Sequence, residues 1–149
     1  MVPGRGLGGP TNGHLRERPV TTSSDSRRLS IALRAFGLVF IFGIGLLNRL
    51  WPSGWAWQPE QPAYLHMIWG IYATLGVFLL WAARDPLRHR SLIWFTVWSS
   101  VVHGGIMAVH SITDPGQLAH LWGDVAALFV TAAVLAILMP KGAGGLRSE

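Results

Sequence analysis

Four long uncharged stretches constrain the fold of this chain more than any other feature of its sequence. They cover residues 35–48, 61–83, 91–113 and 125–140, and only eight charged residues occur between Ala35 and Pro140. A helix needs about 20 mostly apolar residues to cross the ~30 Å hydrocarbon layer of a bilayer. Two stretches have that length, and the other two reach it when one charge near a helix end is included. We therefore expect a membrane protein with four spans.

The spans are expected to be helices. Backbone polar groups inside a bilayer must be paired within the protein, so only helices and closed barrels cross it, and the alternating ten-residue pattern of barrel strands is absent. We predict an all-α membrane protein of four antiparallel transmembrane helices, at about residues 31–50, 63–83, 91–110 and 117–139. Asp25 or Ser26 can cap the start of the first helix, and Arg34 can snorkel back to the head groups.

Two tails flank the predicted bundle. Residues 1–30 are rich in Gly, Pro, Ser, Thr and Arg, and such a segment buries too little apolar surface to offset the entropy of ordering it. We predict a disordered basic tail there, and expect it not to be a secretory signal because it lacks an apolar core. Residues 141–149 form the predicted C-terminal tail.

Composition excludes several classes of function. The chain has no cysteine, which removes disulfides, thiol redox catalysis and cysteine-ligated zinc or iron–sulfur clusters. Its net charge of +5 would suit a nucleic-acid partner, yet arginines that flank membrane spans explain the excess. We therefore expect no nucleic acid as a partner. The expected partners are the lipid bilayer and, because four short helices enclose little volume, a second copy or another membrane protein.

The distribution of basic residues predicts the orientation. The first tail has five arginines, and the other basic residues on the same side are Arg84, Arg88, Arg90, Lys141 and Arg147. Only Arg49 lies on the opposite side. By the positive-inside rule both termini are cytoplasmic, and we expect a multi-pass protein of the bacterial inner membrane. Three tryptophans of the first loop are predicted to be anchors at the outer interface: Trp51, Trp55 and Trp57.

Polar side chains within the predicted spans gather towards the outer side. The candidates for a polar cavity there are His66, His103, His110, His120, Asp124 and Arg49. His103 and His110 are seven residues apart, so they fall within about 20° of each other around one helix. His120 and Asp124 are four residues apart on the fourth helix, where side chains can meet. This pattern predicts a cavity that opens outward.

Asp124 lies well inside the fourth predicted span. Unlike the other charged residues, it cannot be placed in a loop or at a helix end by shifting a helix boundary by two residues. A buried carboxylate needs a partner, and the candidates are His120, Arg49, His66 and His110. Two interpretations stay open. The carboxylate either makes one structural pair that holds the bundle in register or belongs to a functional site.

The same histidines are candidate ligands of a metal ion or a haem. Imidazole and carboxylate groups suit zinc, copper or iron. However, no H-E-x-x-H spacing occurs, and His103 and His110 are too far apart along one helix to hold one ion. A haem between His103 and either His66 or His120 is an alternative. The sequence alone assigns no metal, and no cofactor is expected.

Three segments carry a resemblance to a known family: PSGWAW at residues 52–57, GIYATLG at residues 70–76, and residues 84–104, which begin RDP and end SLIWFTVWSSVVHG. They resemble a family of short four-span bacterial membrane proteins known only as a domain of unknown function. The resemblance covers about residues 34–140. It implies the four-span architecture and a bacterial inner membrane, and it implies no activity or ligand.

We therefore expect an integral membrane protein that is not an enzyme, most simply a scaffold or accessory protein. One alternative is a small proton-coupled transporter or ligand-binding protein that uses the His/Asp cavity, because imidazole exchanges protons near neutral pH. The other alternative is a haem- or metal-binding membrane protein.

Overall fold

The computed structural model describes residues 23–57 and 62–140, and this part of the chain contains helices and no strand. The α-helices are α1 (Ser23–Leu38), α2 (Ile44–Leu50), α3 (Pro62–Ala82), α4 (Arg90–Thr113) and α5 (Asp124–Leu138). They are joined by a π-helical turn, η1 (Val39–Gly43), and by the 3-10 segments η2 (Pro52–Gly54), η3 (Pro86–His89) and η4 (Pro115–Leu121).

Four helical segments are long and apolar enough to cross a membrane: Ser24–Leu50, Pro62–Ala82, Pro86–Thr113 and Pro115–Leu138. In the second of them only 17% of the apolar window is buried inside the chain, so most of its side chains face outward. Four such helices are compatible with a multi-pass membrane protein. The predicted all-α class is confirmed for the described residues, with four helices long and apolar enough to span a membrane.

The first helix begins earlier than the predicted tail boundary. α1 starts at Ser23, so residues 23–30 of the tail that we assigned to 1–30 are helical. Leu29 and Leu33 are fully buried in the hydrophobic core, and the Ser30 hydroxyl donates to the carbonyl of Ala83. These contacts supply the apolar burial that the tail composition did not predict. Residues 1–22 and the predicted tail at 141–149 lie outside the described residues.

Two glycines allow the first hairpin to close. α1 and η1 pack along α3, and a methyl group at Gly76 would lie 2.6 Å from the carbonyl oxygen of Gly37. No larger side chain fits at that distance, so the two backbones approach directly, as small residues permit in membrane helices. The π-helical turn η1 follows, and its Phe40 is buried against α3.

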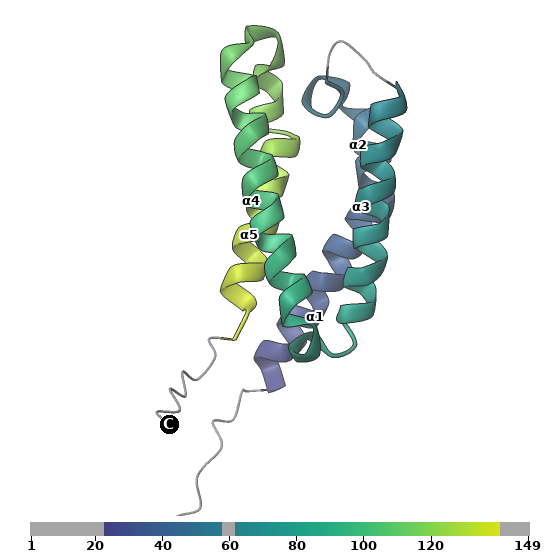
Figure 1. Cartoon of the computed structure of the whole chain (residues 1–149), viewed down its shortest axis with the longest axis vertical. Coiled ribbons are helices and arrows are strands. Elements are labelled where there is room, and N and C mark those ends of the chain that lie inside the picture. Colours follow the sequence, from purple (N-terminus) through teal and green to yellow (C-terminus); the bar gives the residue numbers. More distant parts are fainter. Residues whose placement is uncertain (1–22, 58–61, 141–149) are drawn as a thin grey trace, which may run out of the picture.

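The second hairpin pairs α4 with α5. The two helices lie side by side along much of their length (Figure 1). At Gly104 a methyl group would meet the Leu128 Cβ at 3.3 Å, so this pair is also closely packed. α3 and α4 contact each other little, and the molecule is therefore two hairpins rather than an evenly packed bundle.

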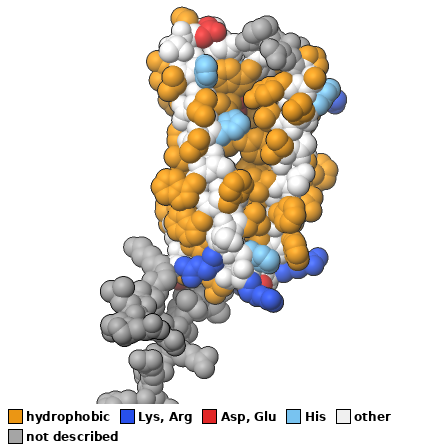
Figure 2. All heavy atoms as spheres, in the orientation of Figure 1, with side chains coloured by type: hydrophobic (Ala, Val, Ile, Leu, Met, Phe, Trp, Pro, Cys, Tyr) orange, Lys and Arg blue, Asp and Glu red, His pale blue; other side chains and the backbone are white. Residues whose placement is uncertain are grey.

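The hydrophobic core lies mainly at one end of the hairpins. That end carries the start of α1, the connection from α3 to α4 and the end of α5 (Figure 1). The buried apolar residues that form this core cluster are Leu29, Leu33, Phe40, Leu79, Ala82, Ala83, Ile93, Val97, Ala132, Leu135 and Met139. We call this end of the two hairpins the arginine end, because Arg27, Arg28, Arg84, Arg88 and Arg90 lie there. Figure 2 shows basic side chains gathered at this end, below a broad band of hydrophobic ones.

The fourth span is not one continuous helix as predicted for residues 117–139. Pro115–Leu121 forms 3-10 turns, and α5 begins only at Asp124, after Gly123. Asp114 caps the 3-10 segment, since its side chain accepts from the backbone N–H of Gly116 at 2.9 Å. Residues 120 and 124 therefore lie on either side of a break.

Candidate functional site

The loop after α2 folds onto η4 at the end of the hairpins opposite the arginine end. The Asn48 side chain donates to the carbonyl of Trp55 at 3.0 Å, and the Trp51 ring covers Gly54. Gly54 then meets Gly123 backbone to backbone, since a methyl group at Gly123 would lie 2.1 Å from the Gly54 carbonyl oxygen. This contact ties the loop of the first hairpin to the break in the fourth span.

Three side chains next to this contact form a compact polar cluster. Trp57 Nε1 donates to Asp124 Oδ2 at 2.8 Å, and His120 Nδ1 lies 3.0 Å from the same oxygen. The rings of Trp57 and His120 stack with centroids 4.1 Å apart and planes inclined by 28°. We call Gly54, Trp57, His120, Gly123 and Asp124 the clasp, because they join the two hairpins.

His120 and Asp124 share one hydrogen bond within the clasp. An ionised carboxylate only accepts, so His120 Nδ1 carries the proton when it bonds to the ionised form of Asp124. His120 is 0% exposed and Asp124 8% exposed. Within the described residues, His120 Nε2 and Asp124 Oδ1 are buried with no hydrogen-bond partner, as are Trp69 Nε1 and Ser111 Oγ. In the clasp, Asp124 Oδ2 thus accepts from two donors, whereas Asp124 Oδ1 and His120 Nε2 have no partner among the described residues.

A second polar contact joins the hairpins farther from the loop. The Tyr72 hydroxyl of α3 lies 3.2 Å from His103 Nδ1 of α4. Tyr72 also meets the buried Phe40 of η1 edge-on, with ring centroids 5.2 Å apart. His103 therefore holds α3 and α4 together where few other contacts do.

The structure brings together only some of the six predicted cavity residues. His120 and Asp124 meet, whereas Arg49, His66 and His110 are exposed. His66 packs edge-on against Trp69, at a centroid distance of 5.8 Å. Arg49, His66 and His110 were further candidate partners for Asp124, but the bonds of Asp124 among the described residues go to Trp57 and His120.

The arrangement supports pairing more directly than metal chemistry. Within residues 23–57 and 62–140 no group of three or more His, Cys, Asp or Glu side chains is placed to hold a metal ion. Asp124 and His120 point at each other, and His103 points at Tyr72.

Sequence reasoning missed Trp57 and Tyr72. Trp57 was predicted only as an interface anchor, yet it is half-buried and its indole nitrogen bonds to Asp124. A buried tryptophan needs an acceptor for its N–H, and Asp124 was the unpaired carboxylate of the spans. That complementarity was the signal available, but nothing in the sequence placed the two residues on neighbouring segments.

The comparisons with known proteins agree with the sequence resemblance. The family DUF6632, described as a family of unknown function, matches residues 23–149. The match begins at the first residue of α1 and includes every element described above. No curated protein and no solved structure matches the chain. The expected relation to an uncharacterised domain family is confirmed, and the chain belongs to DUF6632.

Proposed function

We propose that this membrane protein is a scaffold or accessory protein without catalytic turnover. The observation that carries the proposal is the clasp. Its hydrogen bonds connect Trp57, His120 and Asp124 to one another rather than to an open cavity. A carboxylate used in this way fixes the relative position of two hairpins, which is the role of a buried polar group that specifies one arrangement.

Complementation of a strain that lacks the gene tests this proposal. Asp124→Asn keeps an acceptor for Trp57 and His120 but cannot exchange a proton, and His103→Ala removes the bond to Tyr72. If the polar residues are structural, variants that fold and reach the membrane should complement the deletion. Helical content and membrane abundance are measured in parallel, so that a loss of folding is distinguished from a loss of function.

The same experiment tests the alternative of a small proton-coupled transporter or ligand-binding protein. Two buried polar atoms that have no partner in the described part of the chain, His120 Nε2 and Asp124 Oδ1, favour this alternative, because unpaired buried polar atoms are costly and need a reason. A well-folded Asp124→Asn variant that fails to complement would support proton or cation handling and overturn the accessory role. A neutral amide can neither take a proton nor balance a cation.

We further propose that the arginine end faces the cytoplasm of a bacterium and that the clasp faces outward. Among the described residues, Arg27, Arg28, Arg84, Arg88 and Arg90 lie at one end, whereas Arg49 is the basic residue near the other. This asymmetry follows the positive-inside rule. An even number of spans then leaves both termini in the cytoplasm.

The absence of cysteine gives a direct test of orientation. Ser53→Cys lies in η2 near the clasp and Ser91→Cys at the start of α4, and both serines are exposed. In intact cells a membrane-impermeant maleimide should label only Ser53→Cys, and Ser91→Cys should react after permeabilisation. Labelling of Ser91→Cys alone in intact cells would reverse the orientation.

A further inference from the structure

Ser111, in the last turn of α4, carries a buried hydroxyl that has no hydrogen-bond partner among the described residues. Its side chain is 0% exposed, although the neighbouring His110, Ile112 and Thr113 are exposed. The hydroxyl therefore faces the interior of the second hairpin. A buried polar group without a partner is rare in a native structure and needs an explanation.

The register of α4 and α5 places this hydroxyl beside the clasp. The two helices pack side by side, and Gly104 lies level with Leu128, because a methyl group at Gly104 would meet the Leu128 Cβ at 3.3 Å. Ser111 follows Gly104 by seven residues, so it lies on nearly the same face and about 10 Å closer to the clasp. Asp124 lies about 6 Å from Leu128 in the same direction.

The ring of His120 occupies the level of Ser111. His120 belongs to η4, beyond the start of α5, and its ring turns back to bond with Asp124 at 3.0 Å. The ring therefore lies between the levels of these two residues, and α4 packs against η4 there. The second ring nitrogen, Nε2, is buried and has no partner in the described part of the chain. Two fully buried side chains with unpaired polar atoms thus lie at one level, on neighbouring segments.

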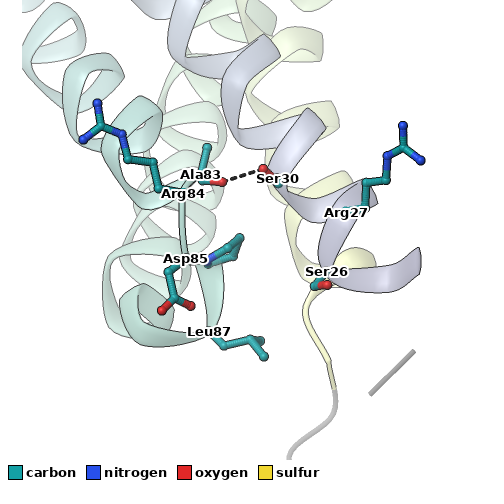
Figure 3. A pocket seen from close by; sticks show the side chains of 8 residues that line it. Ser26, Arg27, Ser30, Ala83, Arg84, Asp85 and Leu87 are labelled. Atoms are coloured by element: carbon teal, nitrogen blue, oxygen red, sulfur yellow. Dashed lines mark hydrogen bonds between the residues drawn. The ribbon is translucent and has the colours of Figure 1, made fainter. Parts of the chain in front are cut away.

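A serine already joins two segments of this chain at the arginine end. There the Ser30 hydroxyl of α1 donates directly to the carbonyl of Ala83, which follows α3 (Figure 3). Ser111 Oγ and His120 Nε2 make no such direct bond. An ordered water molecule that bridges two protein groups is nearly as favourable as a direct bond, and buried waters commonly satisfy polar groups that have no other partner.

We propose that one buried water molecule bridges Ser111 Oγ and His120 Nε2. The Ser111 hydroxyl donates to the water, and the water donates to Nε2, which accepts when Nδ1 carries the proton that is shared with Asp124. The bridge fixes the tautomer of His120 and extends the clasp to α4. Ser111 is then a positioning residue for His120, an inference that rests on the proposed structural role of the clasp.

Nuclear magnetic resonance of the full chain in detergent micelles, with ¹⁵N-labelled histidine rings, tests the bridge. The signals of His120 are assigned by their loss in His120→Gln and by their response to Trp57→Phe, because the two rings stack. The ¹⁵N shift of a ring nitrogen distinguishes a protonated nitrogen from an acceptor, and a bonded acceptor from a free one. We expect Nδ1 to be protonated, Nε2 to be a bonded acceptor, and magnetisation to pass from water protons to this ring.

Ser111→Ala is the decisive variant, and Ser100→Ala is its matched control. Ser100 is also buried and lies on the same face of α4, about three turns from Ser111. Ser111→Ala should move the Nε2 shift to that of a free acceptor and abolish the transfer from water, whereas Ser100→Ala should change neither. In SDS titration, Ser111→Ala and His120→Gln should be coupled by about fivefold in the unfolding equilibrium constant, the effect of one hydrogen bond. Circular dichroism checks that each variant folds.

Three results would overturn the proposal. An unchanged Nε2 shift in folded Ser111→Ala would show that the two groups do not interact. A changed shift without transfer from water in the wild type would replace the bridge by a direct bond. Protonation of both ring nitrogens would make Nε2 a donor and contradict the assigned tautomer. Failure of Asp124→Asn to complement would overturn the accessory role but would not alter these wild-type spectra, so the two failures are distinguishable.

Discussion

Gly123→Ala should open the clasp. The added methyl group would lie 2.1 Å from the carbonyl oxygen of Gly54 and 2.8 and 2.9 Å from its carbonyl carbon and Cα. All three atoms belong to backbone, which cannot rotate away as the end of a flexible side chain can. The loop and the start of α5 must therefore separate.

The required movement can be worked out from the contact distances. Real Cβ atoms essentially never approach another heavy atom closer than 3.0 Å, so the backbones must part by at least 0.9 Å. The bond from Trp57 to Asp124, which is 2.8 Å long, would stretch to about 3.7 Å and be lost. A hydrogen bond to a charged group contributes about 1.5–3 kcal/mol and overpacking costs about 1–3 kcal/mol. We expect a loss of about 3 kcal/mol, or roughly 150-fold in the unfolding equilibrium constant.

The assay is SDS titration of the purified protein in mild detergent, followed by circular dichroism and tryptophan fluorescence. Gly105→Ala is the matched control, because nothing lies within 4 Å of a methyl group there. It should leave stability unchanged or raise it by up to ~1 kcal/mol, the usual advantage of Ala over Gly within a helix. A Gly123→Ala protein as stable as wild type would refute the backbone contact and the clasp built on it.

Three further substitutions have defined outcomes. Trp57→Phe keeps a ring beside His120 but removes the indole N–H, and should cost about 1–2 kcal/mol in the same SDS titration; no change would mean that the bond to Asp124 contributes nothing. Asp124→Leu leaves the donors of Trp57 and His120 without an acceptor and should lower the free energy of unfolding by about 3 kcal/mol, whereas Asp124→Asn should lower it by about 1 kcal/mol. The opposite order would contradict the hydrogen-bond assignment. Gly76→Ala should cost about 2 kcal/mol by forcing the first hairpin apart at Gly37, and thermal unfolding at or above the wild-type temperature would refute that packing.

The fold class was predictable because it depends on composition along the chain. Uncharged stretches of membrane length require helices, and prolines and charged residues mark where those helices end. The start of α1 was not predictable in this way. Capping by Asp25 or Ser26 placed a helix start within three residues of Ser23, whereas the polar composition extended the predicted tail to residue 30, because Leu29 and Leu33 are buried by residues of other helices.

The candidate site was predictable in its residue types but only partly in its contacts. A carboxylate inside a span needs a partner, and the spacing of four residues made His120 a candidate. The actual contact does not use helical spacing, since the helix is broken between the two residues. The break depends on Gly123 meeting Gly54, two residues far apart in the sequence, and no periodicity within one segment contains that information.

The position of the clasp relative to the hydrophobic core determines what its loss does. Most core residues lie at the arginine end, in the first turns of α1 and α4 and the last turns of α3 and α5, so they keep the hairpins together when the clasp opens. Opening is therefore local, and the free energy lost by any clasp variant cannot exceed what the clasp itself contributes. A hairpin pair joined by apolar packing at one end and by a few polar contacts at the other separates first at the polar end. For this reason the buried carboxylate of Asp124 in the fourth span, rather than additional apolar packing, sets the distance between the two hairpins at the clasp.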